Sequence, residues 1–68
     1  MQDQDVERIL RDVLSTSGLF AAIQGVERKP GGWRVTIRDE GARILSTEVP
    51  DGRPGLMRAA LTQWVGSR

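Results

Sequence analysis

Seven polar side chains are the strongest candidates for chemistry in this chain, and six of them are cationic. They stand in a turn, along a strand and near the start of a helix: Arg28, Lys29, Arg34, Thr36, Arg38, Arg53 and Arg58. Arginine and lysine recognise carboxylates and phosphates, which occur on protein surfaces and on nucleic-acid backbones. The sequence therefore predicts a binding protein, and its other features bear on what it binds.

The residues that common enzyme mechanisms need are missing. The chain has no histidine and no cysteine, which removes the usual proton relays, thiol nucleophiles and zinc ligands. Asp39 and Glu40 fall in a predicted turn, and two carboxylates are fewer than the roughly six to eight oxygen ligands that Ca²⁺ takes. The hydroxyls of residues 15–17 fall at a helix end, where capping is their expected role. We predict that the protein is not an enzyme and holds neither a cofactor nor a metal.

One glycine-containing segment could bind an anion. Gly52-Arg53-Pro54-Gly55 precedes a predicted helix, and helix N-termini present free N–H groups and a positive dipole end. The segment lacks the spacing and the lysine of a phosphate-binding loop. We interpret it as a turn followed by the start of a helix.

Two segments have the apolar period of an amphipathic helix. Over residues 5–16, apolar side chains recur every three or four positions, at Val6, Ile9, Leu10, Val13 and Leu14. Over residues 54–65 they recur in the same way, at Met57, Ala60, Leu61, Trp64 and Val65. Asp3 or Asp5 can cap the first helix, and Gly18 suits the left-handed residue that follows a helix end.

Between the helices the period changes to that of strands. Trp33, Val35 and Ile37 alternate with polar residues, as a half-buried strand requires. This pattern predicts a hairpin with strands over residues 33–38 and 43–49.

A further strand is predicted over residues 20–28, where the apolar side chains are three positions apart. Either a bulge at Gly25 explains this spacing, or the first helix continues past Gly18.

We therefore expect a single α+β domain over residues 1–68 with the order α-β-β-β-α. Its three-stranded antiparallel sheet carries both helices on one face, in two layers. The faces of the third strand depend on the length of the hairpin loop. A three-residue loop turns Leu45, Thr47 and Val49 inward, whereas a two-residue loop turns Ile44 inward.

Size bears on function as well. A chain of 68 residues buries only about 60 % of its unfolded surface, and without cysteine it has no disulfide to compensate. Self-association is the remaining route to added stability. No apolar run is long enough to cross a membrane, and the acidic N-terminus is unlike a secretory signal, so we expect a cytoplasmic protein with no membrane contact.

Charge is unevenly distributed along the chain. Residues 1–27 carry two basic and five acidic side chains, a net charge of −3, and residues 28–68 carry eight basic and four acidic, a net charge of +4. This asymmetry can pair two protomers or attract an acidic partner.

The predicted element order resembles that of the double-stranded RNA-binding domain. In that family the first helix, the loop between the first two strands and a lysine-rich start of the second helix contact about 16 base pairs. The resemblance implies that residues 28–32 form that loop and that Arg53 and Arg58 mark the helix start. The lysine run is missing here, and the first helix is rich in carboxylates.

The sequence thus predicts a small non-catalytic protein-interaction module, most simply a homodimer. The alternative is a nucleic-acid-binding domain that uses the basic residues of the first turn, the outer sheet face and the start of the second helix.

Overall fold

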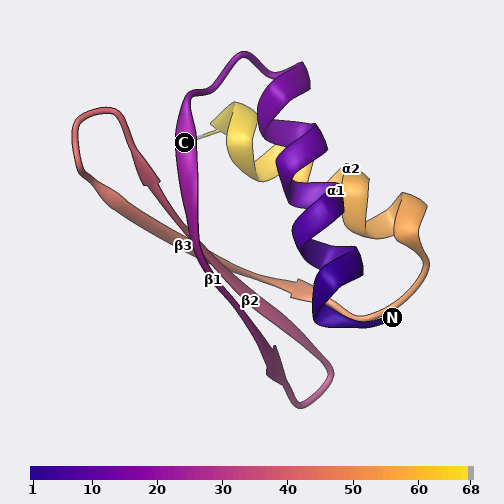
Figure 1. Cartoon of the computed structure of the whole chain (residues 1–68). Coiled ribbons are helices and arrows are strands. Elements are labelled where there is room, and N and C mark those ends of the chain that lie inside the picture. Colours follow the sequence, from indigo (N-terminus) through magenta and orange to yellow (C-terminus); the bar gives the residue numbers. More distant parts are fainter. Residues whose placement is uncertain (68) are drawn as a thin grey trace.

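The computed structural model describes residues 1–67 and confirms the predicted order α-β-β-β-α (Figure 1). Its elements are α1 (Asp3–Thr16), β1 (Ala21–Lys29), β2 (Gly32–Asp39), β3 (Ile44–Pro50) and α2 (Pro54–Ser67). The strands form one antiparallel sheet in the order β1-β2-β3. The predicted domain ends at residue 68, which lies outside the described residues.

Helix α1 begins two residues earlier than predicted because its cap lies earlier. The N–H of Gln2 donates to the carboxylate of Asp5 at 2.9 Å, so Asp5 acts from inside the first turn and Gln2 occupies the cap position. At the other end the N–H of Gly18 donates to Ser15 and that of Leu19 to Leu14. These two bonds, with Gly18 at φ +70°, make a Schellman ending. Helix α1 therefore stops where the sequence predicted.

Strand β1 is bulged, which decides between the two predictions for this segment. Ile23 pairs with Ile37 and Gly25 with Thr36, so Gln24 is the extra residue. The bulge returns Val26 to the inner face with Ile23, and this explains the spacing of three. The alternative prediction, that α1 continues past Gly18, is wrong.

The β2–β3 hairpin settles which side chains of β3 face the core. Leu45, Thr47 and Val49 pair with Ile37, Val35 and Trp33, so they share the inner face. Ile44 pairs with Arg38 and is exposed. The connection leaves four residues, 40–43, between the strand ends. The Asp39 carboxylate accepts hydrogen bonds from the N–H groups of Gly41 and Arg43, at 3.0 and 2.9 Å.

Helix α2 extends to Ser67, two residues beyond its predicted end. The carbonyl of Arg53 accepts the first hydrogen bonds of the helix, from Leu56 and Met57. Met57, Leu61 and Val65 are buried, and Trp64 is half-buried against the same core.

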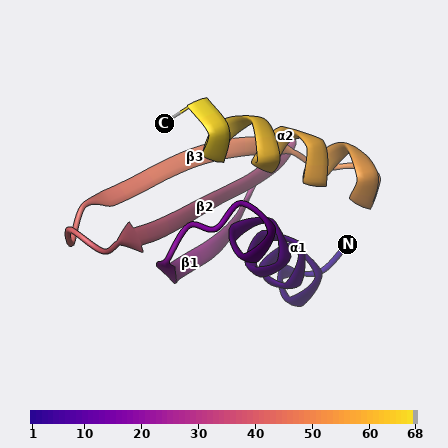
Figure 2. The ribbon, with the colours of Figure 1, turned by 90° about the horizontal axis from the view of Figure 1, so that it is seen from above.

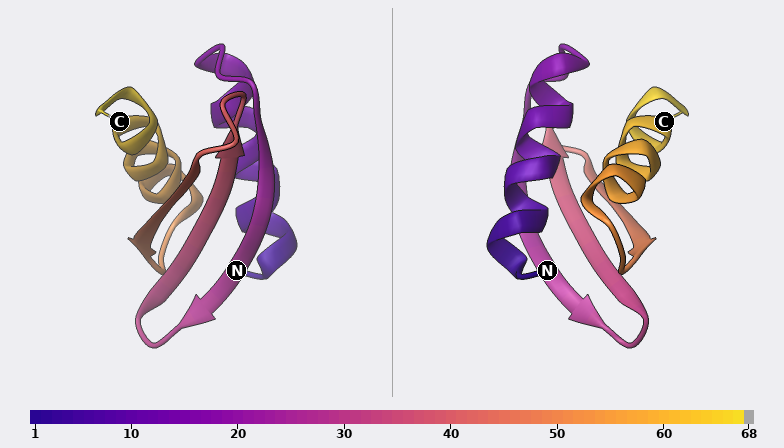
Figure 3. Two further views of the ribbon diagram at one scale, coloured as in Figure 1. Left: turned by 90° about the vertical axis from the view of Figure 1, so that its left-hand side faces the viewer. Right: turned by 90° about the vertical axis from the view of Figure 1, so that its right-hand side faces the viewer.

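Both helices cover one face of the sheet, as predicted. In Figure 2, α1 lies beside β1 and α2 runs along β3. The two views of Figure 3 show the sheet in front of the helices on one side and behind them on the other. Trp33, Val35 and Ile37 are at most 3 % exposed between the layers. No described helix is long and apolar enough to span a membrane.

Candidate interaction surface

The side of the sheet turned away from the helices is exposed and mixed in character. We call it the open sheet face. Its cross-strand rows combine one residue from each strand, as follows: Ala22, Arg38 and Ile44; Gly25, Thr36 and Ser46; Glu27, Arg34 and Glu48. The middle row is small and uncharged, and charged residues stand in the rows on both sides of it, Arg38 in one and Glu27, Arg34 and Glu48 in the other.

Acidic neighbours accompany two of the candidate cations on this face. Arg34 forms an ion pair with Glu48 at 2.7 Å, and this contact raises the pKa of the Arg34 guanidinium above its usual value, with Glu27 adding a smaller effect. Lys29 lies 3.1 Å from Glu27. Because these carboxylates already compensate the cations, the open sheet face is a poor match for a run of phosphates.

The other predicted site residues do not converge on that face. Arg58, on α2, forms an ion pair with Asp12 of α1. Arg28 lies on the inner side, at the end of the sheet, with its guanidinium 4.9 Å from the ring of Trp33. Among the described residues, Arg38 and Arg53 form no ion pair, and they stand on the sheet and in the loop before α2. The structure brings Arg34, Thr36 and Arg38 together and leaves Arg28, Arg53 and Arg58 apart from them.

Asp51 connects the loop after β3 to the edge of the core, a role that the sequence did not indicate. It accepts a hydrogen bond from Trp33 Nε1 at 3.2 Å and lies 3.4 Å from Arg28. The bond from Trp33 lowers the pKa of Asp51, burial opposes this effect in part, and the positive charge of Arg28 adds a smaller lowering. The contact explains how Trp33 can be buried with its indole N–H satisfied.

This contact predicts a pH-dependent stability. Because the pKa of Asp51 is lower in the folded state, its carboxylate stabilises the fold fully above about pH 3.9, the unfolded value, and less as pH falls through the folded value. We expect Asp51→Asn to lower the unfolding temperature at pH 7, with a difference from the wild type that shrinks below about pH 4. Thermal unfolding followed by circular dichroism from pH 7 to pH 2.5 measures this, with Glu40→Gln in the exposed turn as the control. A constant difference at every pH would contradict it.

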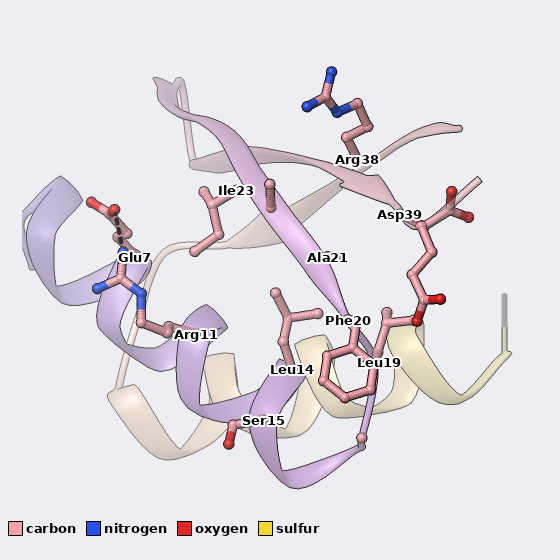
Figure 4. A pocket seen from close by; sticks show the side chains of 13 residues that line it. Glu7, Arg11, Leu14, Ser15, Leu19, Phe20, Ala21, Ile23, Arg38 and Asp39 are labelled. Carbon is pink, nitrogen blue, oxygen red and sulfur yellow. Dashed lines mark hydrogen bonds and ion pairs between the residues drawn. The ribbon is translucent and has the colours of Figure 1, made fainter. Parts of the chain in front are cut away.

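A hollow lies elsewhere on the described surface, between α1 and the beginning of β1 (Figure 4). It has a volume of about 780 Å³. Its apolar lining comes from Leu14, Leu19, Phe20, Ala21, Ala22 and Ile23. On the α1 side its rim carries Glu7 and Arg11, joined by an ion pair of 2.9 Å, and on the β2 side it carries Arg38, Asp39 and Glu40.

Phe20, which lines this hollow, is highly exposed. Its side chain is 73 % exposed, the largest value among the large apolar side chains described, followed by Leu56 at 67 % and Ile44 at 59 %. A single exposed apolar residue is common on protein surfaces, but Phe20 lies at an open strand edge beside a hollow whose lining is partly apolar. The prediction placed Phe20 within the first strand, whereas β1 begins one residue later.

A signal for this surface was present in the sequence. Leu19-Phe20-Ala21-Ala22-Ile23 is an uncharged run, whereas both flanking regions carry charged residues. The irregular period of the run predicts a strand, but periodicity alone does not show whether a neighbouring strand covers its edge. No protein-family model, curated protein or solved structure matches the chain.

Proposed function

We propose that this protein is a small non-catalytic interaction module that self-associates into a two-fold dimer. The observation that carries the proposal is the apolar start of β1, where an open strand edge, a hollow and a highly exposed Phe20 coincide. Surfaces that combine these features are typical sites of protein contact.

The size of the domain supports self-association. Its accessible surface is 4511 Å², and a standard interface covers about 800 Å² per partner, so one contact would cover a substantial share of the molecule. The described residues contain no disulfide. A partner that binds only the folded state adds stability in proportion to the logarithm of its concentration. A second copy is such a partner.

The geometry supports nucleic-acid binding less than it supports self-association. It requires cations that converge on one face, and four of the six candidates stand within ion pairs: Arg28 with Asp51, Lys29 with Glu27, Arg34 with Glu48, and Arg58 with Asp12. The carboxylate of Asp12 also places negative charge beside the second helix. The open sheet face therefore offers mixed charge rather than a basic surface.

The concentration dependence of unfolding tests the proposal. Because a dimer is favoured by mass action, we expect the midpoint of thermal unfolding to rise steadily over a roughly hundredfold range of protein concentration. A midpoint independent of concentration would contradict it. A short RNA duplex that raises the midpoint at low salt, with no effect of protein concentration, would favour the nucleic-acid alternative instead.

A further inference from the structure

Two strand edges of the sheet are available to a second copy, and they differ in composition. The β3 edge ends in Pro50 and carries Glu48, two features that discourage pairing with another strand. The β1 edge carries Glu27, Arg28 and Lys29 in its second half only. Its first half, with the two residues before it, has no charge and no proline. The first half of β3, residues 44–47, is also uncharged, but Arg43 precedes it, whereas residues 19–26 are uncharged throughout, so the first half of β1 belongs to the longer unprotected edge.

We propose that residues 19–23 of two copies pair as antiparallel strands across a two-fold axis at Ala21. The pairing joins the two sheets into one of six strands, and the partner is a second copy of this chain. The inference rests on the proposed function, because it names the interface through which self-association occurs.

In this arrangement the run is complementary to itself. Antiparallel pairing about Ala21 sets Leu19 opposite Ile23 of the other copy, and Phe20 opposite Ala22. Each large aromatic ring then lies across from a small side chain, and each leucine meets an isoleucine on the same face. Because the axis repeats every contact, one protomer provides both halves of the match.

The bulge and the charges select this alignment. Gln24 is the extra residue of β1, so an axis placed there would put an irregular backbone at the centre of the pairing. An axis further along would bring Glu27, Arg28 and Lys29 opposite the same charged segment of the other copy. An axis at Ala21 leaves all three outside the paired segment and exposed to water.

The hollow beside β1 leaves room for this contact. It lies between the α1 side chains, residues 18–23 and residues 38–40, and no described part of the chain fills that space. Glu7 and Arg11 on its α1 side form a neutral ion pair, whereas the β2 side of its lining carries Arg38, Asp39 and Glu40. The exposed ring of Phe20 becomes covered, which provides the apolar burial for association.

Disulfide trapping tests the position of the axis, and a chain without cysteine is well suited to it. In Ala21→Cys the two introduced residues face each other, with Cα atoms about 4.5–5.5 Å apart, inside the range of disulfides. In Ala22→Cys they are displaced along the strands to roughly 8 Å, outside that range. We expect Ala21→Cys to form a covalent dimer with oxidised glutathione at least about tenfold faster than Ala22→Cys or Leu56→Cys. Equal rates at the three positions would overturn the alignment.

A charge placed at position 20 tests the interface without cysteine. We expect Phe20→Glu to raise the dimer dissociation constant at least about 100-fold, because both copies lose an aromatic contact and bury a carboxylate. Leu56→Glu is the matched control, since Leu56 is almost as exposed but lies on α2. It is expected to change the constant by less than about threefold. Far-ultraviolet circular dichroism checks that both variants fold.

The outcomes separate this inference from the proposed function. A wild-type chain that dimerises, together with a Phe20→Glu variant of unchanged dissociation constant, overturns the β1 interface and leaves self-association standing. Loss of the dimer in Ile44→Glu alone would place the interface on the open sheet face. A wild-type chain that stays monomeric would contradict both the β1 interface and the proposed self-association.

Discussion

Replacement of Gly32 by alanine is expected to destabilise the domain by about 2–3 kcal/mol, a large effect for the addition of one methyl group. Gly32 begins β2, is buried and pairs with Lys29 on one side and Pro50 on the other. A Cβ atom at this position would overlap the carbonyl oxygen of Val49 and lie 3.2 Å from its carbonyl carbon. These atoms belong to the backbone of β3, so relief requires the strand to move rather than a side chain to rotate.

Gly25→Ala is the matched control for this prediction. Gly25 also lies in a strand, but no atom would lie within 4 Å of an added Cβ, and its φ is not in the left-handed region. We expect this variant to be at least as stable as the wild type, because alanine reduces the conformational freedom of the unfolded chain. Urea unfolding at one protein concentration compares the two variants. Equal stability of Gly32→Ala and Gly25→Ala would contradict the close approach of β2 and β3.

Trp33→Ala is expected to have the largest effect of any single truncation, about 3–5 kcal/mol. The side chain is 3 % exposed within the layer between the sheet and the helices. Its loss also removes the hydrogen bond to Asp51 and the contact with the Arg28 guanidinium. A domain of this size has a total stability of roughly 3–10 kcal/mol, so much of the variant will be unfolded at room temperature. Circular dichroism in buffer without denaturant measures that fraction.

The second tryptophan supplies the comparison. Trp64 is half-buried near the end of α2 and packs on the outside of the core cluster, so Trp64→Ala should cost clearly less than Trp33→Ala. Trp33→Phe separates packing from hydrogen bonding, because it keeps an aromatic ring and removes the indole donor. We expect its cost to be about 1–2 kcal/mol. Equal costs for the two alanine variants would show that Trp33 does not anchor the core.

The fold could be predicted because each element has an uninterrupted local signal. Val35 and Ile37 repeat with the period of a strand, and the period of three to four in α1 leaves Val6, Leu10 and Val13 at most 2 % exposed. The order of the elements and their burial then leave one economical two-layer arrangement. The sequence does not decide on which face of the sheet Ile44 lies, because this depends on the turn before β3 rather than on a period. In that turn the Asp39 carboxylate accepts hydrogen bonds from two backbone N–H groups.

The interaction surface was harder to predict, and for physical reasons. Residue type alone indicates the candidate cations, and it does not reveal that Arg58 meets Asp12 across the two helices, 46 positions apart in sequence. Nor does it reveal that Arg28 covers Trp33 at the end of the sheet. The sequence predicts Phe20 as an apolar residue of a strand, and only the tertiary structure shows that its side chain is 73 % exposed. Contacts between distant segments decide which side chains remain available.

Sedimentation equilibrium of the wild-type chain and of Phe20→Glu, over a roughly hundredfold concentration range, tests self-association through β1 most directly. We expect the wild type to change from the mass of a monomer toward that of a dimer as concentration rises. Phe20→Glu should keep the monomer mass over the same range. A wild type that remains a monomer throughout, or a variant that dimerises as the wild type does, would contradict dimer formation through residues 19–23.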